Sequence, residues 1–114
     1  MKLSIANENL KIEFSFLEQL LAARLHKFWE IPFSHIEQVT TNKPQTHWRD
    51  LRSPGSSIPG LIRAGTYYTN RGKEFWYVTK KQNYLVIELK DEPYKRIILT
   101  IDENSGWKQQ LNNF

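Results

Sequence analysis

The chain has 114 residues, four of them tryptophan and none cysteine, and a formal net charge of +4. Its length suits one domain with one core, and its 39% hydrophobic and 25% charged residues exclude an intrinsically disordered protein. The lack of cysteine excludes disulfide bonds, thiolate metal sites and cysteine catalysis. We therefore expect a single globular domain over residues 1–114.

The apolar runs of the chain are short. None exceeds four residues, the length of Leu20–Ala23, which is far below the roughly 20 residues that cross a bilayer. The first residues lack the apolar core of a signal peptide. These observations predict a cytoplasmic protein.

The positive charge is concentrated in the middle of the chain. Residues 43–81 carry 8 basic and 2 acidic residues, whereas residues 1–42 and 82–114 each carry 4 basic and 5 acidic ones. If the central basic groups share a face, they create a field that attracts anions. The alternative is an ordinary solvent-exposed surface with a small excess of basic residues.

The first predicted elements are a hairpin and a short helix. Apolar residues at every second position over 3–5 and 10–14, on either side of a polar turn, predict a half-buried β-hairpin. Helical spacing of apolar residues then predicts one or two turns from Phe16 to about Arg24. Strands are expected at 28–31, where Pro32 ends the run, and at 36–41 after a tight turn.

Residues 42–60 are the least regular part of the sequence. They contain three prolines, two glycines and three serines between 53 and 57, which predicts a long loop. Loops of this length inside a compact domain are commonly functional or mobile. The segment Gly55–Gly60 suits either an anion-binding nest or a simple Pro/Gly turn.

Four strands and a helix are predicted after this loop. The strands, at 61–69, 74–79, 84–90 and 95–101, are separated by short turns and predict hairpins of an antiparallel meander. Gly65 interrupts the first of them, which indicates a bulge, a bend or a close approach. An apolar stripe of Trp107, Leu111 and Phe114 predicts a C-terminal helix, capped by Asp102 or Asn104, that docks on the sheet. The expected fold is mainly β: a bent antiparallel barrel of seven or eight strands capped by one α-helix.

Several segments, in this order, resemble a known family. They are Ile31–Ile36 (IPFSHI), Arg52–Gly60 (RSPGSSIPG), Ala64–Tyr67 (AGTY), Glu74–Trp76 (EFW), Leu85–Leu89 (LVIEL) and Tyr94–Leu99 (YKRIIL). Over nearly its whole length the chain resembles a bacterial pleckstrin-homology-like (PH-like) domain of a small stand-alone type. The resemblance implies a PH-like barrel and says little about activity. Eukaryotic relatives of this fold often bind phosphoinositides through basic residues around the first hairpin, but here Lys11 is the only cation near that turn, so this ligand is not expected.

Signatures of catalysis and of metal binding are weak. The three histidines, at 26, 35 and 47, are too far apart to be neighbouring ligands on one helix or strand. The segment Gly55–Gly60 lacks the Lys-Ser/Thr of a phosphate loop, and no serine lies in a nucleophile elbow. We expect no enzyme, no metal and no cofactor, and a small hydrolase is the poorest of the functions considered.

Aromatic and basic residues are mixed in the central segment. The predicted binding residues are Trp48, Arg49 and Arg52 in the loop and Arg71, Lys73 and Trp76 in the next hairpin. Strand alternation places either Tyr68 and Trp76 or Tyr67 and Phe75 at the surface, and the other pair in the core. The alternative to a binding site is that the aromatic residues pack in the core and the basic residues only surround them at the surface.

These residues predict a non-catalytic binding module. We expect a protein partner or an anionic ligand or membrane surface, with Trp48 as the apolar anchor and Arg71 and Lys73 steering association. The alternative is the binding of single-stranded nucleic acid on an aromatic barrel face, which a steep salt dependence would reveal.

Overall fold

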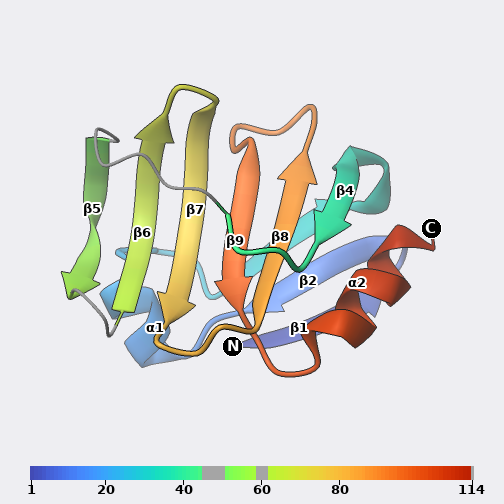
Figure 1. Ribbon diagram of the computed structural model, residues 1–114, viewed down its shortest axis with the longest axis horizontal. Helices are drawn as coiled ribbons and strands as arrows, with labels where there is room; N and C mark the ends of the chain where they lie inside the picture. Colours follow the sequence, from blue (N-terminus) through green and yellow to red (C-terminus); the bar gives the residue numbers. More distant parts are fainter. Residues whose placement is uncertain (45–50, 59–61, 114) are drawn as a thin grey trace.

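The computed structural model describes residues 1–44, 51–58 and 62–113, with residues 51–58 described in their backbone alone (Figure 1). These residues form two β-sheets, with helices at one end of the core and along one side. The elements are, in chain order, β1 (Lys2–Ala6), β2 (Asn9–Glu13), α1 (Phe16–Leu21), β3 (Phe28–Pro32), the 3₁₀ helix η1 (Phe33–His35), β4 (Ile36–Thr40), β5 (Leu51–Ile58), β6 (Ile62–Thr69), β7 (Gly72–Thr79), β8 (Tyr84–Leu89), β9 (Arg96–Thr100) and α2 (Asn104–Asn112).

The smaller sheet has the antiparallel order β1-β2-β3. The turn between β1 and β2 consists of Asn7 and Glu8, which both have positive φ angles, of 53° and 63°. Two such residues make the tight turn whose twist matches that of the flanking strands. The predicted N-terminal hairpin is therefore confirmed, and so is the short helix that follows it.

The larger sheet has the order β4-β8-β9-β7-β6-β5. The predicted hairpins β6–β7 and β8–β9 are present, but β9 lies between β7 and β8 and runs parallel to β7. The predicted antiparallel meander is therefore wrong at this point. Both β8 and β9 carry runs of consecutive apolar residues, Leu85–Ile87 and Ile97–Leu99, which suit strands that are covered on both faces.

Strand β5 lies within the segment that was predicted to be a loop. It pairs with β6 at the edge of the larger sheet, and the pairing register shifts between Arg52 and Gly55. Pro54 lies inside this shift. Proline cannot donate to a ladder and is confined to edge strands and bulges, so its presence does not prevent a strand here. The prediction of an irregular chain over these residues is corrected.

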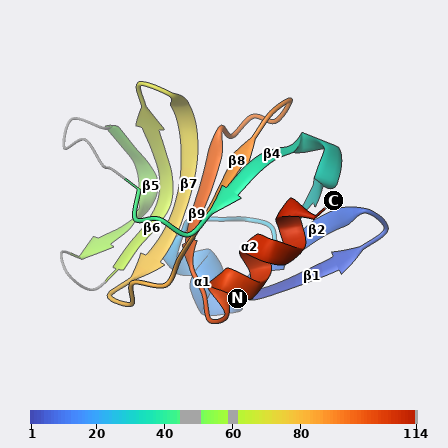
Figure 2. The ribbon, with the colours of Figure 1, turned by 45° about the vertical axis from the view of Figure 1, so that its right-hand side comes forward.

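The core lies between the two sheets (Figure 2). Both sheets contribute fully buried apolar side chains to this core. The smaller sheet and the residue after it supply Leu10, Ile12 and Phe14, and the larger sheet supplies Phe75 and Leu85. No described strand pairs across the two sheets, so the predicted closed barrel is wrong. The prediction of a mainly β fold with a C-terminal helix is confirmed, with nine described strands rather than seven or eight.

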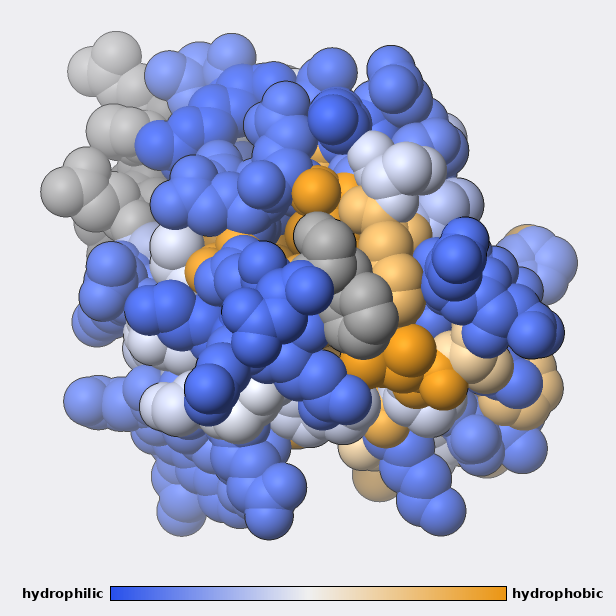
Figure 3. All heavy atoms as spheres, turned by 90° about the vertical axis from the view of Figure 1, so that its right-hand side faces the viewer, coloured by the Kyte–Doolittle hydropathy of each residue, from blue (hydrophilic) through white to orange (hydrophobic). Residues whose placement is uncertain are grey.

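Helix α2 lies against β4 and β8 (Figure 2). Viewed from this side, the surface is largely hydrophilic with an apolar area near its centre (Figure 3). Leu111 is 3% exposed and Trp107 is half-buried against the same core. The Asn112 side chain accepts from the N–H of Val39 (3.1 Å) and donates to its carbonyl (2.9 Å), so it satisfies backbone groups on the edge strand β4. Phe114 lies outside the described residues.

The start of α2 differs from the prediction. The N-cap residue is Glu103, which has a left-handed backbone conformation and makes no side-chain capping bond. Asp102 instead accepts from the Asn83 amide, and Asn104 donates to the carbonyl of Tyr84 at 2.8 Å. The Asn104 side-chain oxygen accepts from the neighbouring Ser105 N–H at 3.0 Å, so this side chain bonds both to the start of the helix and to the end of the β8 region.

Gly65 adopts a backbone conformation that other residues rarely reach. Its φ angle is 141°, and it is paired with Gly55 on one side and with Trp76 on the other. We expect Gly65→Val to destabilise the fold, by an amount on the order of 1–3 kcal/mol, despite the higher strand propensity of valine. Thermal unfolding measures the effect. Gly106→Ala is the control, because Gly106 is helical with open space around its missing side chain, and alanine there should be neutral or slightly stabilising. An unchanged or raised Tm for Gly65→Val would contradict the prediction.

No helix of the described chain is long and apolar enough to cross a membrane.

Candidate binding site

Both faces of the larger sheet are buried near its centre. On β7, Phe75 and Tyr77 face the core between the sheets, whereas Trp76 belongs to a second cluster with Tyr67, Val86 and Ile98. The chain that leaves β4 runs across the β8 and β9 side of this second face (Figure 1). The outer face of the sheet is therefore not an open aromatic surface.

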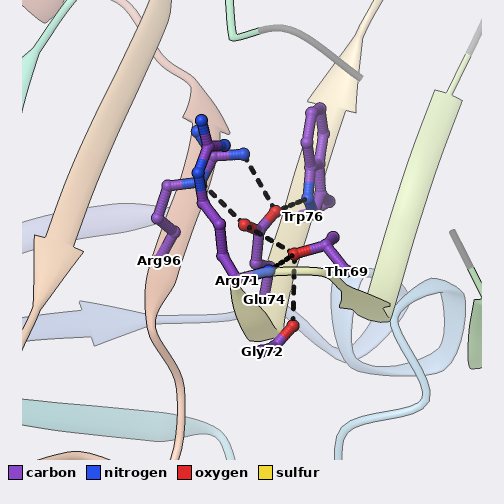
Figure 4. Close-up of polar contacts among 6 residues, drawn as sticks. All are labelled: Thr69, Arg71, Gly72, Glu74, Trp76 and Arg96. Carbon is purple, nitrogen blue, oxygen red and sulfur yellow. Dashed lines mark hydrogen bonds and ion pairs between the residues drawn. The ribbon is translucent and has the colours of Figure 1, made fainter. Parts of the chain in front are cut away.

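A buried carboxylate organises the start of β7 (Figure 4). Glu74 is fully buried, and Arg96 on β9 donates to both of its oxygens, from Nε at 2.9 Å and from Nη2 at 3.0 Å. The Trp76 indole donates to Oε1 at 3.1 Å, and the Thr69 hydroxyl donates to Oε2 at 3.3 Å. A carboxylate held in this way is engaged as a structural anion and is poorly placed to act as a general base.

Trp76 does not belong to an exposed face. It is 4% exposed, and Tyr67 and Phe75 are also buried, so neither of the two predicted arrangements places a pair of rings at the surface. Tyr68, at 47% exposed, is the one member of this group that faces solvent. The prediction of Trp76 as an exposed binding residue is therefore corrected, because its indole packs over the sheet and donates to Glu74.

A cluster of rings and cations lies at the start of β7, on the core side. Trp29 of β3 packs edge-on against Phe75 and Tyr94, with ring centroids 5.5 and 5.0 Å away. The Arg24 guanidinium carbon lies 4.3 Å from the centroid of Trp29, and Lys73 Nζ lies 4.5 Å from that of Tyr94. We call these five residues the aromatic–cation cluster.

The two cations of this cluster have no described acidic partner. The ion pairs among the described residues involve neither Arg24 nor Lys73. Arg24 Nε is buried without a hydrogen-bond partner among those residues. Burial lowers the pKa of Arg24, while the charge interaction with Tyr94 raises it. The rings hold both cations by cation–π contact, so N–H donors are left for an anionic group.

Two further cations are near Lys73. Arg71 is close to it in the sequence, and Lys95 bonds to its backbone. Arg71 is exposed in the β6–β7 turn, and Figure 4 shows its side chain on the side of the Glu74 network. The N–H of Lys95 donates to the carbonyl of Lys73 at 2.7 Å, which joins the β8–β9 connection to the hairpin. Arg71 and Lys73, which were predicted together, thus extend to different sides of one hairpin.

Three other predicted binding residues have less structural description. Trp48 and Arg49 lie outside the described residues, so their roles stay predictions. Arg52 lies on β5 in register with Tyr67, and its backbone alone is described. The other basic residues of the central segment are spread out, because Lys80 and Lys81 follow the far end of β7.

Sequence reasoning missed Arg24, Trp29, Tyr94 and Lys95. Trp29 carried a signal, since strand alternation in 28–31 places it with the core side of β3. Arg24 carried none, because it lies in an irregular connection between α1 and β3. Tyr94 and Lys95 approach the β6–β7 hairpin through the pairing of β9 with β7, which was not predicted.

The titratable residues that the structure describes offer no group of three or more His, Cys, Asp or Glu that could hold a metal ion. His35 pairs through Nδ1 with the Glu92 carboxylate, which ties η1 to the β8–β9 connection.

The described residues form two β-sheets and a C-terminal helix. Residues 1–113 match the family model described as bacterial PH domain, and the chain belongs to this family. PH-like domains are generally non-catalytic binding modules. No curated protein and no solved structure matches the chain.

Proposed function

We propose that this domain is a non-catalytic binding module that binds acidic groups of a partner protein at the aromatic–cation cluster. The carrying observation is that Arg24 and Lys73 lie against the rings of Trp29 and Tyr94 without a described acidic partner. Each ring shields one side of its cation from water. A carboxylate that approaches the other side gains charge-assisted hydrogen bonds in a partly desolvated place.

The composition of the cluster favours a protein partner over a free anion. Protein interfaces are enriched in Trp, Tyr and Arg, and the half-buried Trp29 and Tyr94 offer both apolar area and polar edges. Lys95, whose N–H donates to the Lys73 carbonyl, adds a further cation beside Lys73. The predicted residues Trp48, Arg49 and Arg52 remain part of this proposal, as does a cytoplasmic location.

The alternative, single-stranded nucleic acid, needs exposed rings on which bases stack. Of the rings of β6 and β7, Tyr67, Phe75, Trp76 and Tyr77 are buried. No observation on the described chain favours this alternative, and acidic-protein binding is the function we propose.

The test is the replacement of Lys73 by glutamate. We expect this change to weaken the binding of a glutamate-rich peptide by roughly 10- to 100-fold, because one charge-assisted hydrogen bond is lost and a like charge is introduced. Titration of isotope-labelled protein measures the affinity, and the Trp29 indole N–H resonance reports the place of binding.

Lys80→Glu is the matched control. It changes the net charge equally, but Lys80 is exposed beyond the other end of β7, roughly 20 Å from Lys73 at the usual rise of a strand. Equal weakening by both variants would mean that only net charge matters. A peptide that shifts no resonance near Trp29 or Tyr94 would place the binding site elsewhere.

A further inference from the structure

Strand β5 forms one edge of the larger sheet (Figure 1). It pairs with β6 on one side, and no strand or hydrogen bond of the described residues lies on its other side. The opposite edge of the sheet differs, because the Asn112 side chain bonds to both the N–H and the carbonyl of Val39 on β4. The backbone of β5 therefore keeps outward N–H and carbonyl groups that can pair with another strand.

The regular part of this edge is the segment Gly55–Ile58. The pairing register of β5 shifts between Arg52 and Gly55, and Pro54, within the shift, has no N–H to donate. From Gly55 onward the ladder with β6 is continuous up to Ile58. Each residue of Gly55–Ile58 carries a backbone N–H, so this segment is a regular template for an added strand.

A row of positions without side chains leads inward from this edge. Gly55 is in register with Gly65 on β6, and Gly65 is in register with Trp76 on β7. Residues directly opposite each other share one face of a sheet, and Trp76 lies on the outer face. We call Gly55 and Gly65 the glycine row. A side chain beside Gly55, on the outer face of an added strand, would meet no other side chain in this row before the Trp76 indole.

An arginine without an acidic partner lies beside the glycine row. Arg63 and Tyr67 are two residues before and after Gly65 on β6, so they share its face. The Arg63 guanidinium carbon lies 5.3 Å from the centroid of the Tyr67 ring and 5.4 Å from that of Trp76. The ion pairs among the described residues do not involve Arg63, and the buried Tyr67 hydroxyl has no hydrogen-bond partner there. The donors of Arg63 are therefore left for an anionic group.

The charge of this region favours an acidic segment at the edge. Residues 51–73 contain β5, β6 and the turn after it, and they include four basic residues and no acidic one. These four are Arg52, Arg63, Arg71 and Lys73. Glu74, which follows, is held in the buried ion pair described above, and Asp50, which precedes, lies outside the described residues. A second copy of the chain at this edge would bring like charges together, whereas an acidic segment is attracted.

We propose that an extended acidic segment of a partner protein adds to the free edge of β5 as a further strand, with a glutamate side chain beside Gly55 that reaches Arg63 across the glycine row. Backbone hydrogen bonds to Gly55–Ile58 hold the segment, and the contact with Arg63 selects the residue at one position. Glutamate suits this position better than aspartate, because its side chain has to cross the width of β5.

This edge is separate from the aromatic–cation cluster. The glycine row and Arg63 lie on the outer face of the larger sheet, whereas the cluster lies on its core side. The proposal therefore goes beyond the proposed function and does not depend on it.

A pair of peptides tests strand addition. The first is a short peptide of alternating threonine and glutamate, and the second has the same sequence with its backbone nitrogens methylated. Methylation removes the N–H groups of an added strand and keeps the charges. We expect the first peptide to shift the amide resonances of Gly55–Ile58 in isotope-labelled protein and to slow the hydrogen exchange of these amides. The methylated peptide should bind this edge at least about tenfold more weakly.

Replacing Arg63 by glutamate tests the side-chain contact. We expect Arg63→Glu to weaken binding of the first peptide at β5 by roughly 10- to 100-fold, because a charge-assisted hydrogen bond is lost and a like charge is introduced. Arg63→Gln keeps a polar side chain and should weaken it less, and thermal unfolding checks that both variants are folded. Lys108→Glu is the matched control, because Lys108 is exposed on α2, which lies against β4 and β8 at the other end of the sheet.

Three results would overturn the proposal. The first is that neither peptide affects Gly55–Ile58, and the second is that both peptides bind there equally, so that charge alone attracts them. The third is that the free protein forms dimers in sedimentation velocity with its β5 amides already protected from exchange, which would mean that a second copy occupies the edge. Lys73→Glu should weaken the response of the Trp29 indole and leave that of Gly55–Ile58 unchanged, so this proposal and the proposed function can fail separately.

Discussion

Replacing Glu74 by alanine is expected to lower the free energy of unfolding by about 3–5 kcal/mol, the range found when one partner of a buried ion pair is removed. Arg96 is 7% exposed, so its guanidinium would lose its counter-charge in a place that water reaches poorly. The Trp76 indole and the Thr69 hydroxyl would lose an acceptor at the same time. Urea denaturation of the two proteins measures the difference.

Two controls separate this effect from a general loss of acidic charge. Glu37→Ala removes an exposed carboxylate from β4 and should change stability by less than about 0.5 kcal/mol. Combining Glu74→Ala with Arg96→Met removes both charges, and the double variant should be more stable than Glu74→Ala alone. If Glu74→Ala lowered the free energy of unfolding by less than about 1 kcal/mol, solvent and not Glu74 would be what stabilises the charge of Arg96.

Leu111→Ala is expected to lower the free energy of unfolding by about 2–5 kcal/mol. Leu111 is the buried residue of α2, at 3% exposed, and its side chain is part of the main core. The lost apolar contact and the cavity that remains both add to the cost. The half-buried Trp107 contributes from the same helix, so Trp107→Ala should also be destabilising. Thermal and urea unfolding measure both variants.

The control for α2 is a substitution on its exposed side. Gln109→Ala should be nearly neutral, because Gln109 is exposed and alanine favours the helix. Truncation of the chain after Asp102 removes Leu111 together with the Asn112 bonds to Val39, and should abolish cooperative melting. A truncated chain that melts cooperatively at the same temperature would show that α2 is not part of the folding unit.

The Glu74 network also bears on the proposed binding site. Thr69 and Glu74 lie on the two strands of the β6–β7 hairpin, beside its turn, and Arg96 joins them to β9. The Thr69 hydroxyl also accepts from the Arg71 N–H at 3.1 Å. Lys73 lies between these positions, and its carbonyl is held by Lys95. The structural ion pair between Glu74 and Arg96 therefore holds the segment that carries Lys73, and we expect it to do so without contacting a ligand.

Local sequence patterns determined the elements of this protein. Apolar residues with a period of two predicted the N-terminal hairpin and the four later strands, because side chains alternate across any strand whatever its neighbours are. Apolar residues at helical spacing predicted α1 and α2, because residues three or four apart share one face of any helix. Arg71 and Lys73 were predicted to be binding residues because they lie in one hairpin together with aromatic residues.

Only the tertiary structure decided how these elements combine. The place of β9 beside β7, the strand in the Pro/Gly-rich segment 51–58 and the two separate sheets depend on pairings between distant residues, which periodicity within one segment does not encode. Trp76 is buried because both faces of the larger sheet are covered. The aromatic–cation cluster likewise arises from contacts between segments. Alternation says which side chains share a face, but whether that face meets the core or the solvent is decided by what packs against it.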